Sequence, residues 1–308
     1  MSELITKLPK VRGQYRLNAE LKNWFNISAK AEVLFRPEDK EDLQYFLKNL
    51  DKKIPITILG AASNVIIRDG GIDGVTIRFG KNFATVFAQE NLIKAGVGCL
   101  CSNVALYSKE VGLANLEFLT GIPGSIGGAI AMNAGCYGSD MSQIIVSVTA
   151  FDYDGNLYEL KNSDFAFYYR GSKISEKFIF VEAVLQGQKS TTEIVAKQIA
   201  DFNKKREESQ PIRAKTGGST FKNPNSELTS KKAWQLIDEA GCRGMEENDA
   251  QISVKHCNFM INNGKASAQD LLFLANKVQK EVREKTGINL QLEIKILGKD
   301  KKLSCNLK

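Results

Sequence analysis

Glycine is concentrated in one stretch of the chain, Gly121-Ile122-Pro123-Gly124-Ser125-Ile126-Gly127-Gly128-Ala129, which continues two residues later as Met132-Asn133-Ala134-Gly135-Cys136-Tyr137-Gly138. Six glycines lie within these 18 residues, residues 121–138, which we call the glycine run. Glycine adopts positive φ and lets backbone amides approach a ligand closely. The run therefore suits the wrapping of a diphosphate by N–H groups. A set of tight turns in a crowded fold is the competing interpretation.

A second stretch of small residues precedes the run. The apolar segment Ile56–Leu59 predicts a strand, Gly60-Ala61-Ala62-Ser63-Asn64 a tight turn, and Val65-Ile66-Ile67 another strand. Strand, turn and strand differ from the strand, turn and helix of a Rossmann unit. Two separate loops of small residues favour a dinucleotide over a single crowded turn. We call residues 60–64 the first loop.

The spacing of apolar residues predicts an α+β fold. Helix-like spacing and caps indicate the helices, and extended or alternating apolar residues indicate the strands. We expect Ser102 to cap its helix, and Ile194, Val195, Ile199 and Phe202 to face inward. The expected helices are 41–50, 102–111, 192–207, 233–240 and 271–284, and the expected strands are 56–59, 65–67, 92–97, a hairpin over 144–160 turning at Asp154-Gly155, 178–185 and an alternating strand through Leu292, Ile294 and Ile296.

Length and composition indicate a folded, cytoplasmic protein. The chain has 308 residues, enough for two or three compact units, with 43% hydrophobic and 25% charged residues. No apolar run approaches the ~20 residues that span a bilayer, and the N-terminus lacks the apolar core of an export signal. The six scattered cysteines indicate reduced thiols: Cys99, Cys101, Cys136, Cys242, Cys257 and Cys305.

The charged and histidine residues exclude some functions. His256 is the only histidine, which rules out a histidine-rich metal centre and leaves one imidazole for any hydrolytic triad. The net charge is +7, and the tight basic block Lys204-Lys205-Arg206 is typical of a solvated helix end. We expect no metal, no nucleic acid, no membrane and no obligate protein partner. An anionic small-molecule substrate suits the charge.

The glycine run closely resembles a hallmark of the UDP-N-acetylenolpyruvoylglucosamine reductases, and LGAASNVIIRDGGIDGV from Leu59 resembles their first FAD loop. One such motif would be weak, but the series is ordered and covers nearly the whole chain. The further matches are Tyr168-Tyr169-Arg170-Gly171-Ser172, Lys205-Arg206-Glu207 before Gln210-Pro211, Gly218-Ser219-Thr220-Phe221-Lys222-Asn223-Pro224, Lys255-His256 before Phe259 and Asn262, and Glu293 with Leu297-Gly298.

The resemblance implies a fold similar to the FAD-binding oxidases typified by vanillyl-alcohol oxidase. Two α+β lobes would clasp FAD, and a smaller α+β domain would carry substrate. The implied boundaries are 1–90 for the first lobe, 91–206 for the second and 207–295 for the substrate-binding domain. The C-terminal segment 296–308 is a candidate to return to the first lobe.

The resemblance also implies the reaction. It is the NADPH-dependent reduction of the enolpyruvyl ether of UDP-N-acetylglucosamine to UDP-N-acetylmuramate, for peptidoglycan and hence cell wall, shape and division. FAD would be bound non-covalently, with its pyrophosphate near the loops at Gly60 and Gly124. The implied cofactor-binding residues are Gly60, Ala61, Ala62, Ser63, Asn64, Gly121, Pro123, Gly124, Ser125, Gly127, Gly128, Asn133, Gly135, Tyr137 and Gly138.

Three residues match catalytic positions of the family. Ser219 matches the serine that protonates the carbon next to the carboxylate once hydride has reached the neighbouring carbon. Arg170 matches the arginine that holds the substrate carboxylate. Its planar guanidinium group can stabilise the negative charge that spreads onto the carboxylate oxygens. Glu293 matches the glutamate at the far side of the same carboxylate. Without the motifs, these residues would be a turn serine, a surface or cation–π arginine and a solvent-facing glutamate.

Substrate contacts follow from the same motifs. Lys222, Asn223 and Lys255 are candidate contacts to the uridine diphosphate, since an amide can bind carbonyl oxygens and ammonium groups neutralise phosphate. His256 adjoins Lys255, and either a structural role or a substrate contact fits it.

The chain departs from the family pattern at two places. Ala62 stands where the first loop commonly has glycine, and Ser28-Ala29 replace an earlier glycine pair. These small side chains leave FAD binding expected but change the loop geometry. The region of Glu246-Glu247-Asn248-Asp249 is also unusually acidic. No large insertion separates Arg170 from Ser219, as in the shorter branch that lacks a substrate-clamping tyrosine loop.

Two other functions remain open from the residues. One is a flavin oxidase of the same superfamily that returns electrons to oxygen. The other is a non-catalytic flavin- or nucleotide-binding protein. The joint presence of Ser219, Arg170 and Glu293 argues against both, and NADPH consumption with the enolpyruvyl substrate distinguishes all three.

Overall fold

The computed structural model describes residues 3–301. The chain forms two compact units, and the division passes through three strands. Unit 1 comprises residues up to 17, 33–61 and 74–208, and unit 2 comprises 18–32, 62–73 and the chain from 209. Helices and strands are mixed along the sequence, which confirms the predicted α+β class. Cys305 and the end of the 296–308 segment lie outside the described residues.

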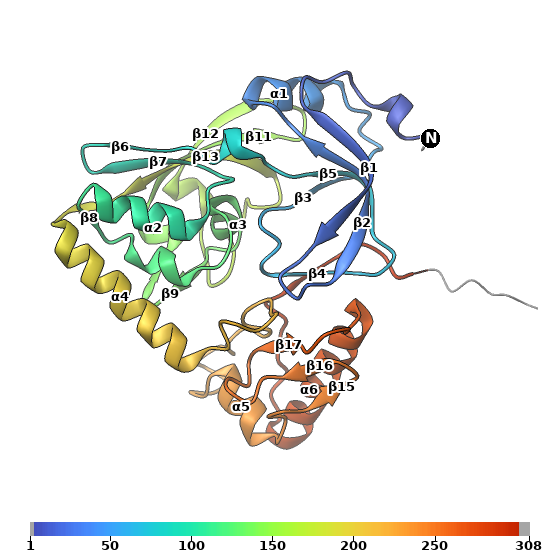
Figure 1. Ribbon diagram of the computed structural model, residues 1–308, viewed down its shortest axis with the longest axis vertical. Helices are drawn as coiled ribbons and strands as arrows, with labels where there is room; N and C mark the ends of the chain where they lie inside the picture. The colour runs from blue at the N-terminus through green and yellow to red at the C-terminus, as the bar shows by residue number, and fades with distance from the viewer. Residues whose placement is uncertain (1–2, 302–308) are drawn as a thin grey trace, which may run out of the picture. The chain divides into compact units, whose positions relative to one another are not determined.

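A four-stranded sheet contains β1 (Gln14–Lys22), β2 (Ser28–Arg36), β5 (Ile72–Ile77) and β3 (Ile56–Ile58), in that order (Figure 1). Strands β3 and β5 are parallel. Helix α1 (Lys40–Asn49) begins where the Asp39 side chain accepts from the Asp42 amide, and it buries Phe46 with Phe35 and Val75. The apolar spacing that predicts this helix is the spacing that packs it on the sheet.

A five-stranded antiparallel sheet is the second layer of unit 1. Its order is β12 (Leu157–Lys161), β11 (Ile145–Asp152), β13 (Phe178–Gln186), β7 (Leu92–Gly96) and β6 (Val86–Gln89). Helix α3 (Ile126–Ala131) packs against β7 and β13 (Figure 1). Gly155 at φ +81° allows the predicted β11–β12 turn. Helices α2 (Cys101–Glu110) and α4 (Thr192–Ser209) supply Val104, Val195 and Ile199 to the same core.

Short elements complete unit 1. They connect the longer elements and include two two-stranded pairs, β8 with β14 and β9 with β10. Their bounds are η1 (Ile5–Lys7), η2 (Lys81–Phe83), β8 (Leu113–Ala114), η3 (Glu117–Gly121), β9 (Gly135–Cys136), β10 (Ser139–Asp140), η4 (Met141–Gln143), η5 (Asn162–Phe165) and β14 (Gln188–Lys189).

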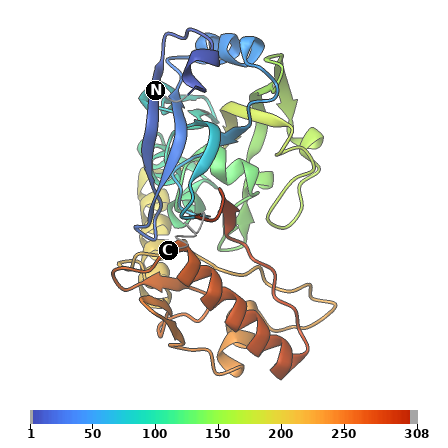
Figure 2. The same cartoon turned by 90° about the vertical axis from the view of Figure 1, so that its right-hand side faces the viewer.

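Unit 2 is built around one long helix. Helix α6 (Ala268–Thr286) packs against α5 (Ala233–Glu239) and against β15 (Glu246–Glu247) and β16 (Ala250–Ile252); Figure 2 shows α6 along its length. Strand β17 (Met260–Asn262) completes the order β15-β16-β17. Strand β18 (Lys295–Leu297) pairs in parallel with β4 (Val65–Ile67). No helix among residues 3–301 is long and apolar enough to cross a membrane.

Three expectations about local structure are wrong. Ser102 is not a cap: α2 begins at Cys101, whose amide donates to the Gly124 carbonyl at 3.0 Å, so backbone pairing sets the helix start. Ile194 is 60% exposed, because Val195 and Ile199, one turn apart, take the inner face of α4. The last strand covers only Lys295–Leu297, because the Glu293 amide donates to the Thr220 carbonyl instead of joining that ladder.

Candidate active site

The glycine run is held against the segment that precedes α2. Its Ile126 and Gly127 amides donate to the carbonyls of Cys99 and Val97 at 2.9 and 3.0 Å, and Gly124 lies at φ +124°. These two N–H groups are therefore used inside the fold and not for a ligand. Part of the run forms tight turns, as the competing interpretation expects.

The first loop meets the glycine run inside unit 1. A Cβ placed on Gly60 would lie 2.7 Å from the Ser125 hydroxyl oxygen. A Cβ on Gly121 would lie 2.7 Å from both the Cys136 sulfur and the Tyr137 ring. Each distance is shorter than a normal carbon contact, so a larger residue at either position would force the facing side chain to move. Gly60 of the first loop and Ser125 of the glycine run, far apart in sequence, thus lie side by side.

The rest of the first loop belongs to unit 2. Ala62, which replaces the usual glycine, is buried at φ +55°, a conformation that glycine adopts without strain. Asn64 donates from Nδ2 to the Glu293 carbonyl at 3.2 Å and accepts at its own carbonyl from the Lys295 amide at 3.0 Å. The end of the first loop therefore fixes the backbone on both sides of Ile294.

Arg170 lies at the corner of a tight turn in unit 1. The Tyr168 amide donates to the Gly171 carbonyl at 3.0 Å, the Gly171 amide donates to the Tyr168 carbonyl at 3.1 Å, and Arg170 has φ +62°. Its guanidinium carbon lies 4.9 Å from the centre of the Tyr169 ring. A Cβ on Gly171 would lie 2.6 Å from the Tyr168 ring, so a larger residue there would displace that ring.

A second arginine near the glycine run was missed from the sequence. Burial raises the pKa of the Cys136 thiol to about 12, while the positive charges of Arg206 and Arg170 oppose the rise. Both guanidinium groups therefore lie near this part of the run. Arg206 is half-buried, whereas Lys204 and Lys205 are exposed. The motif Lys205-Arg206-Glu207 was the available signal, but the basic block led to the expectation of a solvated face for all three.

Ser219 and Glu293 lie on neighbouring backbone in unit 2. Ser219 forms an antiparallel bridge with Phe259, and the adjacent Thr220 amide donates to the Asn258 carbonyl at 2.8 Å. The Thr220 carbonyl accepts from the Glu293 amide at 2.8 Å. Gly218, at φ +81°, turns the chain just before Ser219. The structure thus brings Ser219 and Glu293 together, and both are half-buried.

The candidate substrate contacts lie in the same unit. Asn223 accepts at Oδ1 from the Ala233 amide at 3.0 Å, so its side chain fixes the start of α5. The Lys222 amide donates to the Gln291 carbonyl at 2.8 Å, next to the segment that carries Glu293. The Lys255 side chain is exposed.

His256 is held by aromatic rings. Its ring centre lies 4.8 Å from that of Phe259 and 6.3 Å from that of Trp234. Nδ1 accepts from the Asn258 amide at 3.2 Å, which puts the proton of the neutral ring on Nε2. Burial lowers the pKa of His256, and the charge of Arg243 lowers it further. The ring is therefore a neutral donor at physiological pH.

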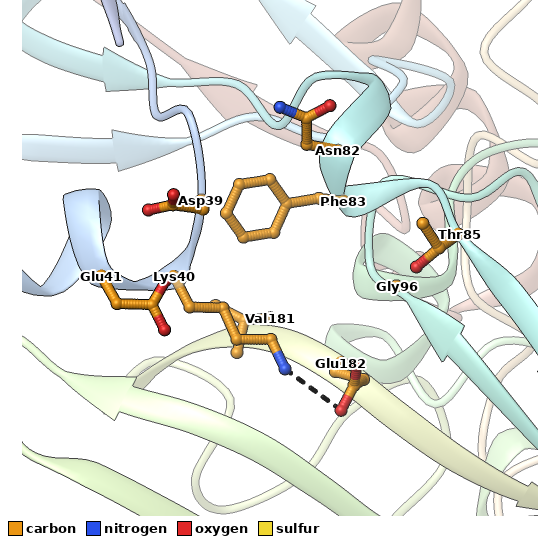
Figure 3. A pocket seen from close by; sticks show the side chains of 9 residues that line it. All are labelled: Asp39, Lys40, Glu41, Asn82, Phe83, Thr85, Gly96, Val181 and Glu182. Carbon is orange, nitrogen blue, oxygen red and sulfur yellow. Dashed lines mark ion pairs between the residues drawn. The ribbon is translucent and has the colours of Figure 1, made fainter. Parts of the chain in front are cut away.

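Unit 1 also has a hollow of about 240 Å³, lined by Asp39, Asn82, Phe83, Thr85 and Glu182 among others (Figure 3). The Glu182 carboxylate pairs with Lys40 at 3.2 Å and with Lys94 at 2.7 Å. None of its lining residues is a predicted site residue. Its lining carries three carboxylates, those of Asp39, Glu41 and Glu182, and one ammonium group, that of Lys40, so its negative charge does not suit an anionic ligand.

Comparison with known proteins identifies the family. The family described as "UDP-N-acetylenolpyruvoylglucosamine reductase, C-terminal domain" matches residues 210–297, and a family described as "FAD binding domain" matches residues 31–161. The UDP-N-acetylenolpyruvoylglucosamine reductase of Wolbachia sp. subsp. Brugia malayi (strain TRS) is 45% identical over 295 residues, which cover 94% of this chain and 98% of that protein. The chain belongs to the UDP-N-acetylenolpyruvoylglucosamine reductase family.

Other members agree. The reductase of Gluconobacter oxydans (strain 621H) is 46% identical over 291 residues, with 94% of each protein covered. The crystal structure of the UDP-N-acetylenolpyruvylglucosamine reductase of Thermus caldophilus matches with a TM-score of 0.80 and 29% identity, covering 94% of this chain and 100% of that one. The resemblance found in the motifs is confirmed, and with it the FAD-binding fold.

The residues present fit FAD. Gly60 of the first loop lies against Ser125 of the glycine run, so the two loops whose backbone amides suit a diphosphate lie together. Within residues 3–301, the fully buried Thr76 hydroxyl has no hydrogen-bond partner. Thr76 alternates with the core residues Val75 and Ile77 in β5 and so points to the other face of the sheet. A buried hydroxyl without a partner is costly, and a polar atom of a bound cofactor would satisfy it.

Proposed function

We propose that the protein reduces the enolpyruvyl ether of UDP-N-acetylglucosamine to UDP-N-acetylmuramate, with NADPH as hydride donor and FAD bound non-covalently. The observation that carries this proposal is the 45% identity, over 94% of the chain, to a UDP-N-acetylenolpyruvoylglucosamine reductase. The match to an FAD-binding domain over residues 31–161 supports the cofactor.

FAD, when bound, supplies the hydride that it has received from NADPH. The residues of the chain would do the rest. Arg170 and Glu293 hold the substrate carboxylate, where the guanidinium stabilises negative charge that spreads onto the carboxylate oxygens. Ser219 donates a proton to the carbon next to that carboxylate. The bond from the Glu293 amide to the Thr220 carbonyl supports a joint role for Ser219 and Glu293.

Ser219 can donate its proton only if its surroundings make the hydroxyl a stronger acid or relay the proton. A free serine hydroxyl is a very weak acid, so a nearby positive charge must lower its pKa or a water must relay the proton. Arg170, already assigned to the carboxylate, and a lysine such as Lys222 are the candidate charges. Lys222, Lys255, His256 and Asn223 would serve the uridine diphosphate half, His256 through the proton on Nε2 and Asn223 by fixing α5.

We further propose that the reaction takes place in the cytoplasm, on a small-molecule substrate and with two FAD lobes, 1–90 and 91–206, beside a substrate domain, 207–295. The five cysteines of the described chain are free thiols, which supports a reducing compartment.

Absorption spectroscopy of the purified protein tests the function. Without air, we expect NADPH to bleach the flavin spectrum and the enolpyruvyl compound to restore it with formation of UDP-N-acetylmuramate. Recovery by oxygen alone, with no response to the enolpyruvyl compound, would establish a flavin oxidase. A spectrum that does not respond to NADPH would instead favour a non-catalytic flavin protein.

A further inference from the structure

The turn that carries Arg170 is fastened on both sides to the end of α3. On one side, Asn133 donates from Nδ2 to the Tyr168 carbonyl at 3.2 Å. On the other, the Ser175 hydroxyl donates to the Ala131 carbonyl at 3.0 Å and lies 2.5 Å from the hydroxyl of Ser172. Ala131 and Asn133 belong to the glycine run, so one side-chain bond connects that run directly to the turn and a second connects it through Ser175 to Ser172, the residue that follows the turn.

The side chain of Asn133 is buried and forms a hydrogen bond at each end of its amide. It is 4% exposed, and its Oδ1 accepts from the Ser142 amide at 2.9 Å while its Nδ2 binds the Tyr168 carbonyl. Its backbone lies at φ +40°, in the left-handed region that asparagine tolerates better than most residues. Both ends of the amide therefore form hydrogen bonds inside unit 1, so the Asn133 side chain links the Arg170 turn to the segment at Ser142.

The turn needs such a link. Arg170 is itself left-handed at φ +62°, and Tyr168 and Tyr169 beside it are exposed, so their side chains bury little surface to hold the turn. Left-handed backbone at a non-glycine residue persists only where surrounding contacts over-determine it. A planar guanidinium also loses its two-point grip on a carboxylate if its base tilts.

We propose that Asn133 and Ser175 are positioning residues that set the geometry of Arg170 from the end of α3. The element that begins inside the glycine run thereby also places the arginine, which couples the cofactor loop to the grip on the carboxylate. The role of Arg170 toward substrate rests on the proposed function; the fastening itself does not.

Asn133→Asp is the informative variant. It keeps an oxygen for the Ser142 amide and the tolerance for positive φ, but it replaces the donor to Tyr168 with an acceptor. We expect the turnover number with the enolpyruvyl compound to fall about 10- to 100-fold, the scale of a misplaced catalytic group, while flavin content and flavin reduction by NADPH stay within about twofold of wild type. Ser175→Ala should act in the same direction.

Asn115→Asp is the matched control. Asn115 also has positive φ, +73°, and donates from Nδ2, but its acceptor is Gln188 at 3.1 Å and not a residue of the Arg170 turn. This variant should keep wild-type turnover. A loss in Asn115→Asp equal to that in Asn133→Asp would overturn the proposal, since it would show a general effect of the substitution.

Two further measurements separate positioning from a simple structural defect. In an Arg170→Ala background, Asn133→Asp should cause no additional loss, because the group it positions is gone. Hydrogen exchange of a peptide covering residues 166–175 should be faster in Asn133→Asp than in Asn115→Asp. Additive losses, unchanged exchange or release of flavin would each refute the proposal. Failure of the wild-type protein to reduce the enolpyruvyl compound would refute the proposed function alone, since the exchange result does not depend on it.

Discussion

Arg170 joins a planar guanidinium to a left-handed backbone at φ +62°. Arg170→Lys keeps the positive charge but loses the two-point fork, so the group can bind the carboxylate without matching its geometry. We expect turnover to fall by ~10²-fold, with a smaller change in the binding of the uridine half, which lies on other residues. Steady-state kinetics with the enolpyruvyl compound measures both. A raised Michaelis constant at an unchanged turnover number would mean that Arg170 only binds.

Ser219 is expected to act in the second half of the reaction, in which substrate reoxidises the flavin and takes up a proton. Ser219→Ala removes the proposed donor, so reoxidation of the reduced flavin by substrate should slow by ~10²–10⁴-fold, the usual contribution of a positioned general acid. Flavin reduction by NADPH needs no proton from Ser219 and should stay near normal. Stopped-flow measurement of each half resolves them, and Ser219→Cys should keep part of the rate. Reoxidation at the wild-type rate in Ser219→Ala would make Ser219 a turn residue.

His256 is the only histidine, so any imidazole contribution to the pH dependence of folding stability comes from this residue. Burial lowers its pKa below the ordinary value of 6.5 in the folded protein, so the unfolded chain binds more protons as the pH falls below 6.5. Stability is therefore present above 6.5 and is lost as the pH falls through the folded pKa. We expect His256→Gln to lose less stability between pH 7.5 and 5 than wild type in urea unfolding. Equal losses would show that the ring titrates alike in both states.

Among the elements, α6 has a capping residue at each end: a capping box at its N-terminus and a glycine at its C-terminus. Ser267 accepts from the Asp270 amide at 3.1 Å, Asp270 accepts from the Ser267 amide at 2.7 Å, and Gly287 ends the helix at φ +74°. Ser267→Ala should lower the free energy of unfolding by about 1 kcal/mol. Chemical denaturation tests this value, with the same substitution at exposed Ser226 as a control. No difference between the two variants would mean that water caps α6 equally well.

Helices such as α1 and α6 could be predicted from the sequence because their apolar spacing and caps are local. The errors arise where distant backbone decides. The start of α2 is set by a bond from the Cys101 amide to the carbonyl of Gly124, a residue distant in sequence, and not by Ser102. The alternation of Leu292, Ile294 and Ile296 suggested one strand, but Thr220 takes the Glu293 amide and divides that segment. Such long-range pairing has no signal in a short window of sequence.

At the scale of the molecule, the candidate site depends on segments that are far apart in the chain. Gly60 and Ser125 are predicted separately as members of small-residue loops, and only the fold brings them into contact. Ser219 and Glu293 likewise meet through the backbone of Thr220. The family motifs identified these residues, whereas Arg206 and the unsatisfied Thr76 were missed. In sequence, Arg206 looks like one more solvated basic residue and Thr76 like an ordinary strand threonine. Only burial distinguishes them from such residues, and sequence does not show burial.

Loss of the cofactor should destabilise the whole protein. A ligand that binds only the folded state adds about 2.7 kcal/mol at a concentration 100 times its dissociation constant, and removing it lowers the melting temperature accordingly. Gly60 and Ser125 of the two small-residue loops lie together in unit 1, whereas the only histidine, His256, packs between aromatic rings in unit 2, so we expect FAD to be held without a covalent bond. Acid or heat should release FAD intact, and adding FAD back, but not FMN, should restore the melting temperature. FMN lacks the second phosphate and the adenosine, so full recovery with FMN would show that the loops do not bind the diphosphate, and flavin that stays with the precipitated chain would show a covalent bond.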